Sequence, residues 1–324
     1  MNVTTHRRGF VLGVGAALAA RSPFAAALAA GRTLGAGFVP STLFAPLFVA
    51  QDRGYLSAAG AATTLTPIVA GQDALALLAT GRLDFIAAGL SAAFFNGVER
   101  GLEVRLVAST GYQPRTGHPS ALMVRRDLYD GGLRAVRDLR GKKIAFNGGA
   151  GATSAYYVAR ILRTAGLHLR DVETLNINVP DQGVAFERKA IDAAFTSAPS
   201  TQAFAEQKLA SILAGPPPGI AGTGIFFGPS LLGDPKTAGA LLDAIRHGAA
   251  DIAGKGYFDA RNLATFAQYT QLPVDVLRRS GRYDFAKDLR VDQATLLDMQ
   301  REFLDQGILT YKTPLDERRL VARF

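Results

Sequence analysis

The chain has 324 residues, enough for two domains of ordinary size, and its apolar residues are spread evenly enough for a globular core. It contains no cysteine, which excludes disulfides, thiolate catalysis and zinc–thiolate sites. The formal charge is +9, but the basic residues are dispersed and no Lys/Arg run alternates with aromatic residues. We therefore expect no nucleic-acid partner.

The first 30 residues have the pattern of an export signal. The pair Arg7-Arg8 precedes an apolar run over 10–20 and a small-x-small site at 27–29. This predicts a twin-arginine signal peptide over residues 1–30, cleaved near Ala29/Ala30 after transport by the twin-arginine translocase. A plain secretory signal is the alternative. Either way we expect a periplasmic mature chain, whose charge falls to +6 because residues 1–30 carry three arginines and no acids.

The most informative stretch, residues 141–166, is predicted to form a strand, a glycine loop and a helix. The glycines of 148–151 permit a sharp turn, and Thr153 or Ser154 can cap the helix that follows. Free backbone N–H groups at a helix start suit an anion or a polar head group. No lysine precedes Thr153, so the loop is not a P-loop, and it lacks the third glycine of a dinucleotide fingerprint. An ordinary strand-to-helix turn remains the alternative.

Strands and helices alternate in two similar series. In the first series, Ser41 or Thr42 would cap the first helix. The spacing from Asp73 to Asp84 in the first series equals the spacing from Asp181 to Asp192 in the second. We therefore expect an α/β protein with two lobes, each built on a mainly parallel sheet. The expected strands are 33–39, 63–69 and 85–88 in the first series and 143–147, 173–179 and 193–196 in the second.

Two connections between these lobes are expected. Strands at 107–110 and 121–125 enclose the polar loop 111–120, which would be the first crossing. The proline-rich segment 214–219 would be the return crossing. The predicted domains are the signal peptide 1–30, a first lobe with a helical C-terminal tail formed by 31–122 and 215–324, and a second lobe formed by 123–214.

The chain resembles the periplasmic substrate-binding proteins of ABC importers for nitrate, taurine, alkyl sulfonates and thiamine-precursor pyrimidines. The likeness covers nearly the whole mature chain in the right order, and it is specific for the family but not for the ligand. The stretches that carry it are 45–56, 77–85, 135–145, 171–173, 190–194 and 306–312.

This resemblance implies the type 2 periplasmic binding protein fold, with two Rossmann-like lobes joined by a two-strand hinge and a ligand held between them. It also implies a monomer whose partners are the permease and ATPase subunits of an ABC transporter. The loops at the carboxyl ends of the strands carry the ligand in such sheets. By position, the ligand contacts would be Ser41, Thr42, Gln72, Gly89, Ser91, Thr153, Ser154 and Thr196.

One position departs from the family pattern. Many members carry an acid just before the proline of the last cleft loop, whereas here Ala198 precedes Pro199. The missing acid disfavours an aminosulfonate such as taurine, and favours a simple anion or a neutral heterocycle.

Several candidates have a structural alternative. The hydroxyls named above would cap helices even without a ligand, and the aspartates at 84 and 192 suit helix-to-strand turns. Arg115 would either pair with an anion or be a solvated loop charge. The aromatic side chains that would either wall the pocket or pack in the core are Phe44, Phe94, Phe95, Tyr156 and Tyr157.

The function predicted from the sequence is capture of a small oxyanion or a sulfonate-like organic anion in the cleft between the lobes. We expect no catalytic residue, no cofactor and no metal site, since the four histidines lack ligand spacing. One alternative is an enzyme of the thiamine-pyrimidine biosynthesis type on the same fold, which the missing cysteine disfavours. Another is a ligand-binding adaptor of a membrane sensor.

Overall fold

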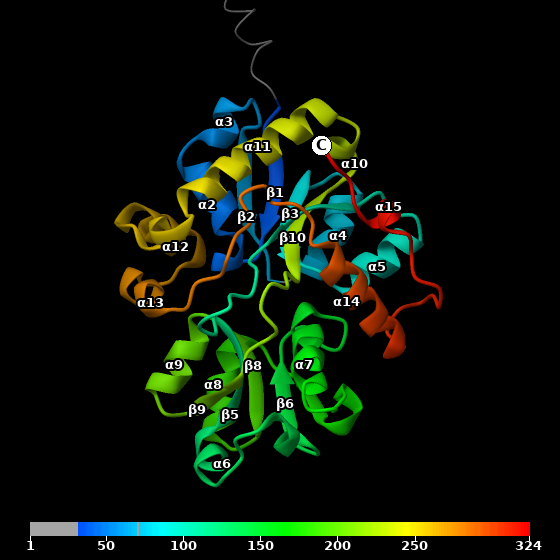
Figure 1. Cartoon of the computed structure of the whole chain (residues 1–324). Coiled ribbons are helices and arrows are strands. Elements are labelled where there is room, and N and C mark those ends of the chain that lie inside the picture. The colour runs from blue at the N-terminus through cyan, green and yellow to red at the C-terminus, as the bar shows by residue number, and fades with distance from the viewer. Residues whose placement is uncertain (1–31, 70) are drawn as a thin grey trace, which may run out of the picture. The chain divides into compact units, whose positions relative to one another are not determined.

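Two five-stranded mixed sheets organise the computed structural model of the chain, which describes residues 32–69 and 71–324 (Figure 1). Residues 33–324 form one compact unit. The predicted signal peptide lies outside the described residues. Among the residues described, no helix has both the length and the apolar character needed to cross a bilayer.

The first sheet has the order β2-β1-β3-β10-β4. β1, β2 and β3 run parallel, while β10 lies antiparallel between β3 and β4. Four of its strands are mostly buried, as expected for a sheet covered by helices, whereas the edge strand β2 is polar and largely exposed. They are β1 (Leu34–Phe38), β2 (Thr63–Pro67), β3 (Phe85–Gly89), β4 (Arg105–Thr110) and β10 (Thr223–Phe227).

The second sheet repeats this order as β7-β6-β8-β5-β9. Again three strands are parallel, and the fourth, β5, is antiparallel to both of its neighbours. The expected two-lobe α/β architecture is therefore present, with mixed rather than purely parallel sheets. Its strands are β5 (Ser120–Arg125), β6 (Lys143–Phe146), β7 (Glu173–Asn176), β8 (Ala193–Ser197) and β9 (Ala210–Ala214).

Helices cover both sheets (Figure 1). Those associated with the first sheet are η1 (Thr42–Phe44), α2 (Ala45–Asp52), α3 (Tyr55–Ala58), α4 (Gly71–Ala79), α5 (Ala92–Glu99), α10 (Pro229–Leu232) and α11 (Pro235–Asp251). Those associated with the second are α6 (Arg126–Asp130), η2 (Val136–Leu139), α7 (Thr153–Arg163), η3 (Leu169–Asp171), α8 (Val179–Glu187) and α9 (Ser200–Glu206). The C-terminal tail holds η4 (Gly254–Phe258), α12 (Ala260–Thr270), α13 (Val274–Arg279), α14 (Gln293–Asp305) and α15 (Glu317–Leu320).

The internal repeat is visible in the hydrogen bonds of two aspartates. The Asp84 carboxylate accepts from the Gly35 amide at 2.8 Å, and the Asp192 carboxylate accepts from the Lys143 amide at 3.0 Å. Each bond joins the turn before the third strand of a sheet to its central parallel strand, across the same sequence separation of 49 residues. The equal aspartate spacing in the sequence thus reflects the same structural role in both lobes.

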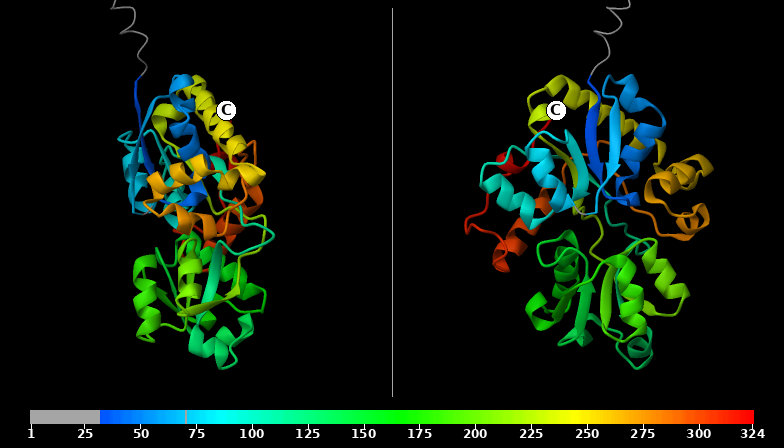
Figure 2. Two further views of the ribbon diagram at one scale, coloured as in Figure 1. Left: turned by 90° about the vertical axis from the view of Figure 1, so that its left-hand side faces the viewer. Right: turned by 180° about the vertical axis from the view of Figure 1, so that it is seen from behind.

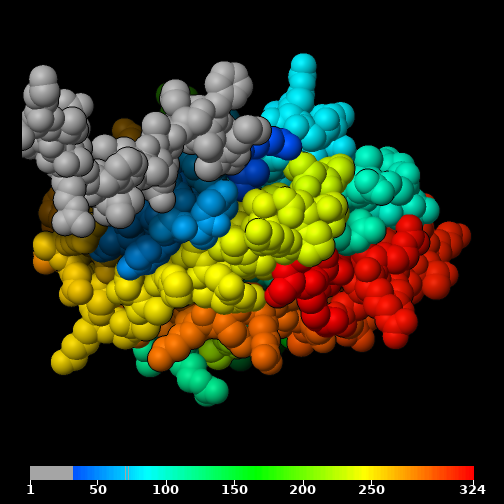
Figure 3. Space-filling view, turned by 90° about the horizontal axis from the view of Figure 1, so that it is seen from above, coloured from blue at the N-terminus to red at the C-terminus, as the bar shows by residue number. Residues whose placement is uncertain are grey.

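Two segments connect the sheets, 111–119 between β4 and β5 and 215–222 between β9 and β10 (Figure 2). A third segment, from the C-terminal tail, lies beside the first of these connections, because Asp284 forms an antiparallel bridge with Tyr112. The tail then returns to the first lobe, where Val321 bridges Leu106 and Phe324 packs on Phe227. Figure 3 shows this last segment beside α11.

Helix α14 contacts both lobes, since it packs against α5 of the first and α7 of the second. The Tyr156 hydroxyl donates to Asp298 at 2.7 Å, and Arg163 pairs with the buried Glu302 at 2.6 Å. At its start, the amide of Asp292 donates to the Ser109 hydroxyl of β4 at 2.9 Å. The helix therefore links the two lobes on one side of the molecule.

Two local predictions were wrong. The predicted strand over 173–179 ends at Asn176, and Val179 already starts α8 with Pro180 behind it, a position in the first helical turn where proline is favoured. Neither Thr153 nor Ser154 caps α7, because Ala152 occupies the cap position and makes no side-chain bond there. Both hydroxyls are used elsewhere, as described below.

Replacing the buried aspartate should cost more stability than replacing its counterpart in the other lobe. Asp84 is 2% exposed and also accepts from the Ser230 hydroxyl, whereas the Asp192 side chain is 22% exposed. We predict that Asp84→Ala lowers the free energy of unfolding by about 3 kcal/mol and Asp192→Ala by about 1 kcal/mol. The difference arises because water can reach the amide that loses Asp192, whereas the donors that lose Asp84 stay buried without a partner. Urea titration measures both, and equal losses would contradict this account.

Candidate functional site

A cavity of about 440 Å³ lies between the two sheets, at the carboxyl ends of their parallel strands. The residues that line it come from the loops after β1, β3, β6 and β8, from the starts of α4 and α8, and from the first residues of β5 and β10. This is the position expected from the topology. The volume lies within the range of ordinary small-molecule sites.

Ser41 lines the cavity at the end of β1. Its hydroxyl oxygen accepts from the Leu43 amide at 3.3 Å and so caps η1, as the sequence predicted. Because the oxygen acts there as an acceptor, the hydroxyl hydrogen remains free to donate to a ligand.

Gly89 and Ser91 also line the cavity, at the end of β3 and the start of α5. Ser91 is 6% exposed, and its hydroxyl has no hydrogen-bond partner among the described residues. A buried hydroxyl without a partner costs free energy unless something else satisfies it. Ser91 is therefore the one residue of the described lining with a buried hydroxyl that has no partner.

The glycine loop is formed as predicted, and its start lines the cavity. Gly148 and Gly149 both have positive φ, at 85° and 71°, and the Gly148 amide donates to the Asn176 side chain at 2.9 Å. Ser154 lines the cavity, but its hydroxyl donates to the carbonyl of Asn147 at 2.5 Å. The loop thus presents backbone and the Asn147 side chain more than a free serine hydroxyl.

Thr153 makes a bond between the lobes. Its hydroxyl donates to the Leu90 carbonyl at 2.6 Å, across the cleft from its own helix. Next to it, the Ala92 amide at the start of α5 donates to the Gly151 carbonyl at 2.8 Å. These two bonds close one edge of the cavity.

Of the predicted contacts, two are placed outside the cavity lining, and the side chain of a third is not described. Thr42 and Thr196 are buried but do not line it, and the Thr196 hydroxyl has no partner among the residues described. Gln72 belongs to α4, and its side chain lies outside what the structure describes. The remaining five predicted residues all line one cavity.

Sequence reasoning missed the polar floor of the cavity. Ser120 of β5 and Ser197 of β8 both line it, and their hydroxyl oxygens lie 3.2 Å apart. The hydroxyl of the buried Tyr283, from the C-terminal tail, lies 2.9 Å from that of Ser120. Ser120 and Ser197 are paired across the neighbouring strands β5 and β8, and the C-terminal tail brings Tyr283 to them.

The described lining of the cavity is electrically neutral, because none of its residues carries a formal charge. Tyr157 is the one phenol in the lining, and burial raises its pKa, so it stays protonated. Its hydroxyl accepts from the Gly222 amide at 2.7 Å, so α7 is bonded here to the return crossing.

Apolar side chains make up much of the remaining wall. Of the three phenylalanines considered from the sequence, Phe44 lines the cavity, whereas Phe94 and Phe95 are core residues that pack on Phe226 and Phe303. The apolar side chains of the lining include Val39, Leu43, Phe44, Val69, Leu90, Val179, Phe195 and Leu272.

The structure offers no cluster of metal ligands among residues 32–69 and 71–324, where no three His, Asp or Glu side chains converge. The polar groups that converge on the cavity are hydroxyls, an amide and the first turns of α5, α7 and α8. Hydroxyl and backbone donors of this kind suit oxygen atoms of a ligand with a single negative charge.

A family model described as NMT1/THI5-like matches residues 41–256, which is two thirds of the chain. No match was found among curated proteins.

Several solved structures share the fold. The alkanesulfonate-binding protein SsuA from Xanthomonas axonopodis pv. citri, bound to MOPS, is 21% identical with a TM-score of 0.68, covering 90% of this chain and 98% of that one. The periplasmic nitrate-binding protein NrtA from Synechocystis PCC 6803 is 13% identical with a TM-score of 0.67, covering 87% and 83%. The desulfurization enzyme DszB, in complex with biphenyl-2-sulfinic acid, is 16% identical with a TM-score of 0.63, covering 90% and 96%.

The contact between Gly89 and Thr153 should tolerate no added methyl group. A Cβ at Gly89 would lie 2.4 Å from the Thr153 hydroxyl oxygen, so in Gly89→Ala either the Thr153 side chain must rotate away from Leu90 or the lobes must move apart at this edge. We predict a loss of about 2 kcal/mol in the free energy of unfolding. Thr153→Ala removes the clashing oxygen, so the double variant should lose at least about 0.5 kcal/mol less than the sum of the single losses.

Gly239→Ala is the matched control, since a Cβ there meets nothing within 4 Å. Urea titrations of the four variants give the coupling energy. Strictly additive losses for Gly89→Ala and Thr153→Ala would show that the two residues do not meet.

Proposed function

Because the chain belongs to the NMT1/THI5-like family, we propose that it is the periplasmic solute-binding component of an ABC importer that captures an organic anion in the cavity between its lobes. The bound solute would be a monoanion with an oxygen-rich head, such as a sulfonate, and an apolar body. The protein would then deliver it to a permease and its ATPase.

The observation that carries this proposal is the unsatisfied Ser91 hydroxyl in a neutral cavity. A ligand oxygen placed there would satisfy a group that the protein leaves without a partner. The free hydrogen of Ser41 lies in the same wall, and the neutral Tyr157 adds no repulsion. Hydroxyls and helix N-termini stabilise one negative charge without a cationic side chain, whereas a dianion would require more.

The size and polarity of the cavity favour an organic anion over an inorganic one. A volume of about 440 Å³ is far more than a nitrate needs. Burying an apolar body against side chains such as Phe44, Phe195 and Leu272 adds affinity that a bare oxyanion cannot gain. Among the similar structures, SsuA is a sulfonate-binding protein, which supports the same class of solute.

Export and delivery complete the proposal. The twin-arginine signal predicted over residues 1–30 would bring the chain to the periplasm, where it would act as a monomer. Two lobes joined by short crossing segments can close on a solute by a hinge motion, and a permease would recognise the closed form. The structures that share the fold include the ligand-binding component of an ABC-type import system from Staphylococcus aureus and the periplasmic binding proteins SsuA and NrtA.

Catalysis is the second candidate, because the enzyme DszB shares the fold. The chain has no cysteine, and no described residue of the cavity lining is a histidine or a carboxylate that could act as a base. Turnover of a bound sulfonate or sulfinate, followed by mass spectrometry of the products, would favour this function over transport.

A panel of solutes should separate the ligand classes. We predict that aryl or alkyl sulfonates stabilise the chain without its signal peptide, and that nitrate, bicarbonate, taurine and aminopyrimidines do not. A solute at a hundred times its dissociation constant adds about 2.7 kcal/mol, which shifts the melting temperature by roughly 5 °C. Stabilisation by nitrate alone, or by no member of the panel, would contradict the proposed solute class.

Removal of the Ser91 hydroxyl should have opposite effects on binding and stability. We predict that Ser91→Ala weakens sulfonate binding about tenfold, because a charge-assisted hydrogen bond is lost. The empty protein should be no less stable, because an unsatisfied buried group disappears. Ser57→Ala on the exposed surface is the control, and calorimetric titration with thermal unfolding measures both effects. Unchanged affinity in Ser91→Ala would remove Ser91 from the site.

A further inference from the structure

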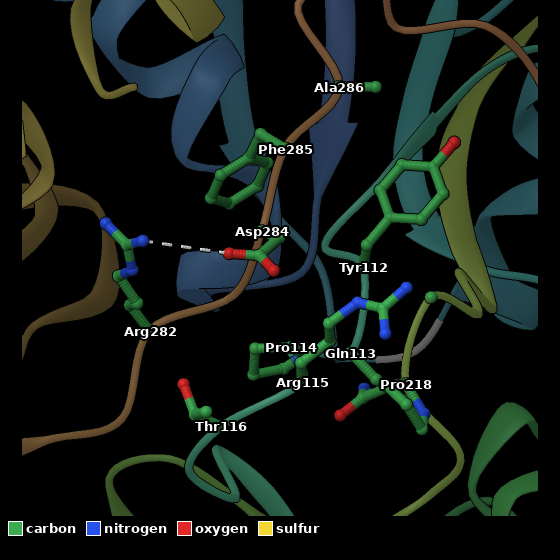
Figure 4. A pocket seen from close by; sticks show the side chains of 11 residues that line it. Tyr112, Gln113, Pro114, Arg115, Thr116, Pro218, Arg282, Asp284, Phe285 and Ala286 are labelled. Atoms are coloured by element: carbon green, nitrogen blue, oxygen red, sulfur yellow. Dashed lines mark ion pairs between the residues drawn. The ribbon is translucent and has the colours of Figure 1, made fainter. Parts of the chain in front are cut away.

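A second cavity of about 450 Å³ lies at the hinge, outside the solute cavity described above. Three separate passages of the chain form it: residues 112–116 of the first crossing, 218–219 of the return crossing, and 282–286 of the C-terminal tail. Figure 4 shows their side chains around the space. Any change in the angle between the lobes must alter these passages, so a molecule held here would act on the hinge.

One guanidinium in this cavity has no counter-ion. Arg115 lines the cavity, is exposed, and makes no hydrogen bond or ion pair with the residues that the structure describes. Arg282 is different, because it lies 3.9 Å from the Asp284 carboxylate and donates to the Gly254 carbonyl. Figure 4 shows the Arg115 side chain between Asp284 and Pro218, facing the space. The cavity therefore carries one positive charge that remains unpaired.

The lining of the hinge cavity is mixed, and three of its residues offer flat apolar side chains. Pro114, Pro218 and Phe285 line the cavity, and the Phe285 ring lies nearly parallel to that of Tyr257, with centroids 6.3 Å apart. Burial raises the pKa of Tyr112 to about 12, so this phenol is neutral and does not oppose an anion. A carboxylate on a small aromatic ring matches both features, since the head pairs with Arg115 and the ring packs on proline and phenylalanine.

The hinge cavity is connected to the solute cavity through Tyr283. This residue lies between Arg282 and Asp284, which line the hinge cavity, but its own hydroxyl points the other way to Ser120, at 2.9 Å. Ser120 in turn lies 3.2 Å from Ser197, and both serines line the solute cavity. Gln113 of the hinge cavity donates to Ser120 at 3.4 Å. A shift of the segment 282–286 would therefore move the floor of the solute cavity.

We propose that the hinge cavity is an effector site for a small aromatic carboxylate, held by Arg115, and that its occupation changes the affinity of the cleft for its solute. The binding part of this inference stands by itself, and the coupling part rests on the proposed function of the cleft.

The probe for the binding part is 4-fluorobenzoate, followed by calorimetry and by ¹⁹F NMR. We expect one binding event in the wild type that Arg115→Gln weakens at least tenfold, as the loss of a charge-assisted pair requires. Arg137→Gln removes the same charge from an exposed helix of the second lobe and should leave this event unchanged. Equal binding to the wild type and Arg115→Gln, or no binding to the wild type at 10 mM, about the limit expected for a weak site, would overturn the proposal.

The coupling part is measured with a solute of the cleft, in the absence and presence of saturating 4-fluorobenzoate. We expect its dissociation constant to change at least fivefold. Tyr283→Phe keeps the ring but removes the hydroxyl, so both ligands should still bind while the coupling disappears. If the probe binds through Arg115 but no solute binds in the cleft, the proposed function would be contradicted, whereas the binding site at the hinge would stand. An unchanged solute affinity at saturating probe would overturn the effector role.

Discussion

The closed edge of the cleft depends on two hydrogen bonds that cross from one lobe to the other. The Thr153 hydroxyl donates to the Leu90 carbonyl, and the Ala92 amide donates to the Gly151 carbonyl. Both are possible only because the backbones approach closely, and a Cβ at Gly151 would lie 2.9 Å from that of Ala92. The glycine loop after β6 therefore joins the lobes as well as shaping the cavity.

Helix α14 reinforces the same edge from outside. Its carboxylates Asp298 and Glu302 meet Tyr156 and Arg163 of α7, while Asp292 at its start is bonded to β4 and to the return crossing. Glu302 is 5% exposed, so separation of α7 from α14 would break a buried ion pair with Arg163. Helix α14 therefore ties the two lobes together beside the edge that Thr153 closes.

The sequence predicted the parts of the site that are encoded locally. Ser41 follows a strand and precedes a helix, so its capping role and its place at the cavity follow from neighbouring residues. The roles of Thr153 and of the cavity floor could not be predicted this way. The Thr153 acceptor is 63 residues away, and the partner of Ser120 is a tyrosine 163 residues along the chain. Such contacts depend on how the lobes meet, which no local pattern records.

We propose that the cavity between the lobes holds an organic monoanion at the starts of α5 and α7. Diffraction from crystals of the signal-free chain grown with 4-iodobenzenesulfonate would locate the solute, because iodine and sulfur mark its two ends. We expect the sulfonate oxygens within hydrogen-bond distance of Ser91 and the iodine among the apolar side chains near Phe44 or Phe195. Iodine located only at the hinge or on the surface, with the cleft unoccupied, would contradict it.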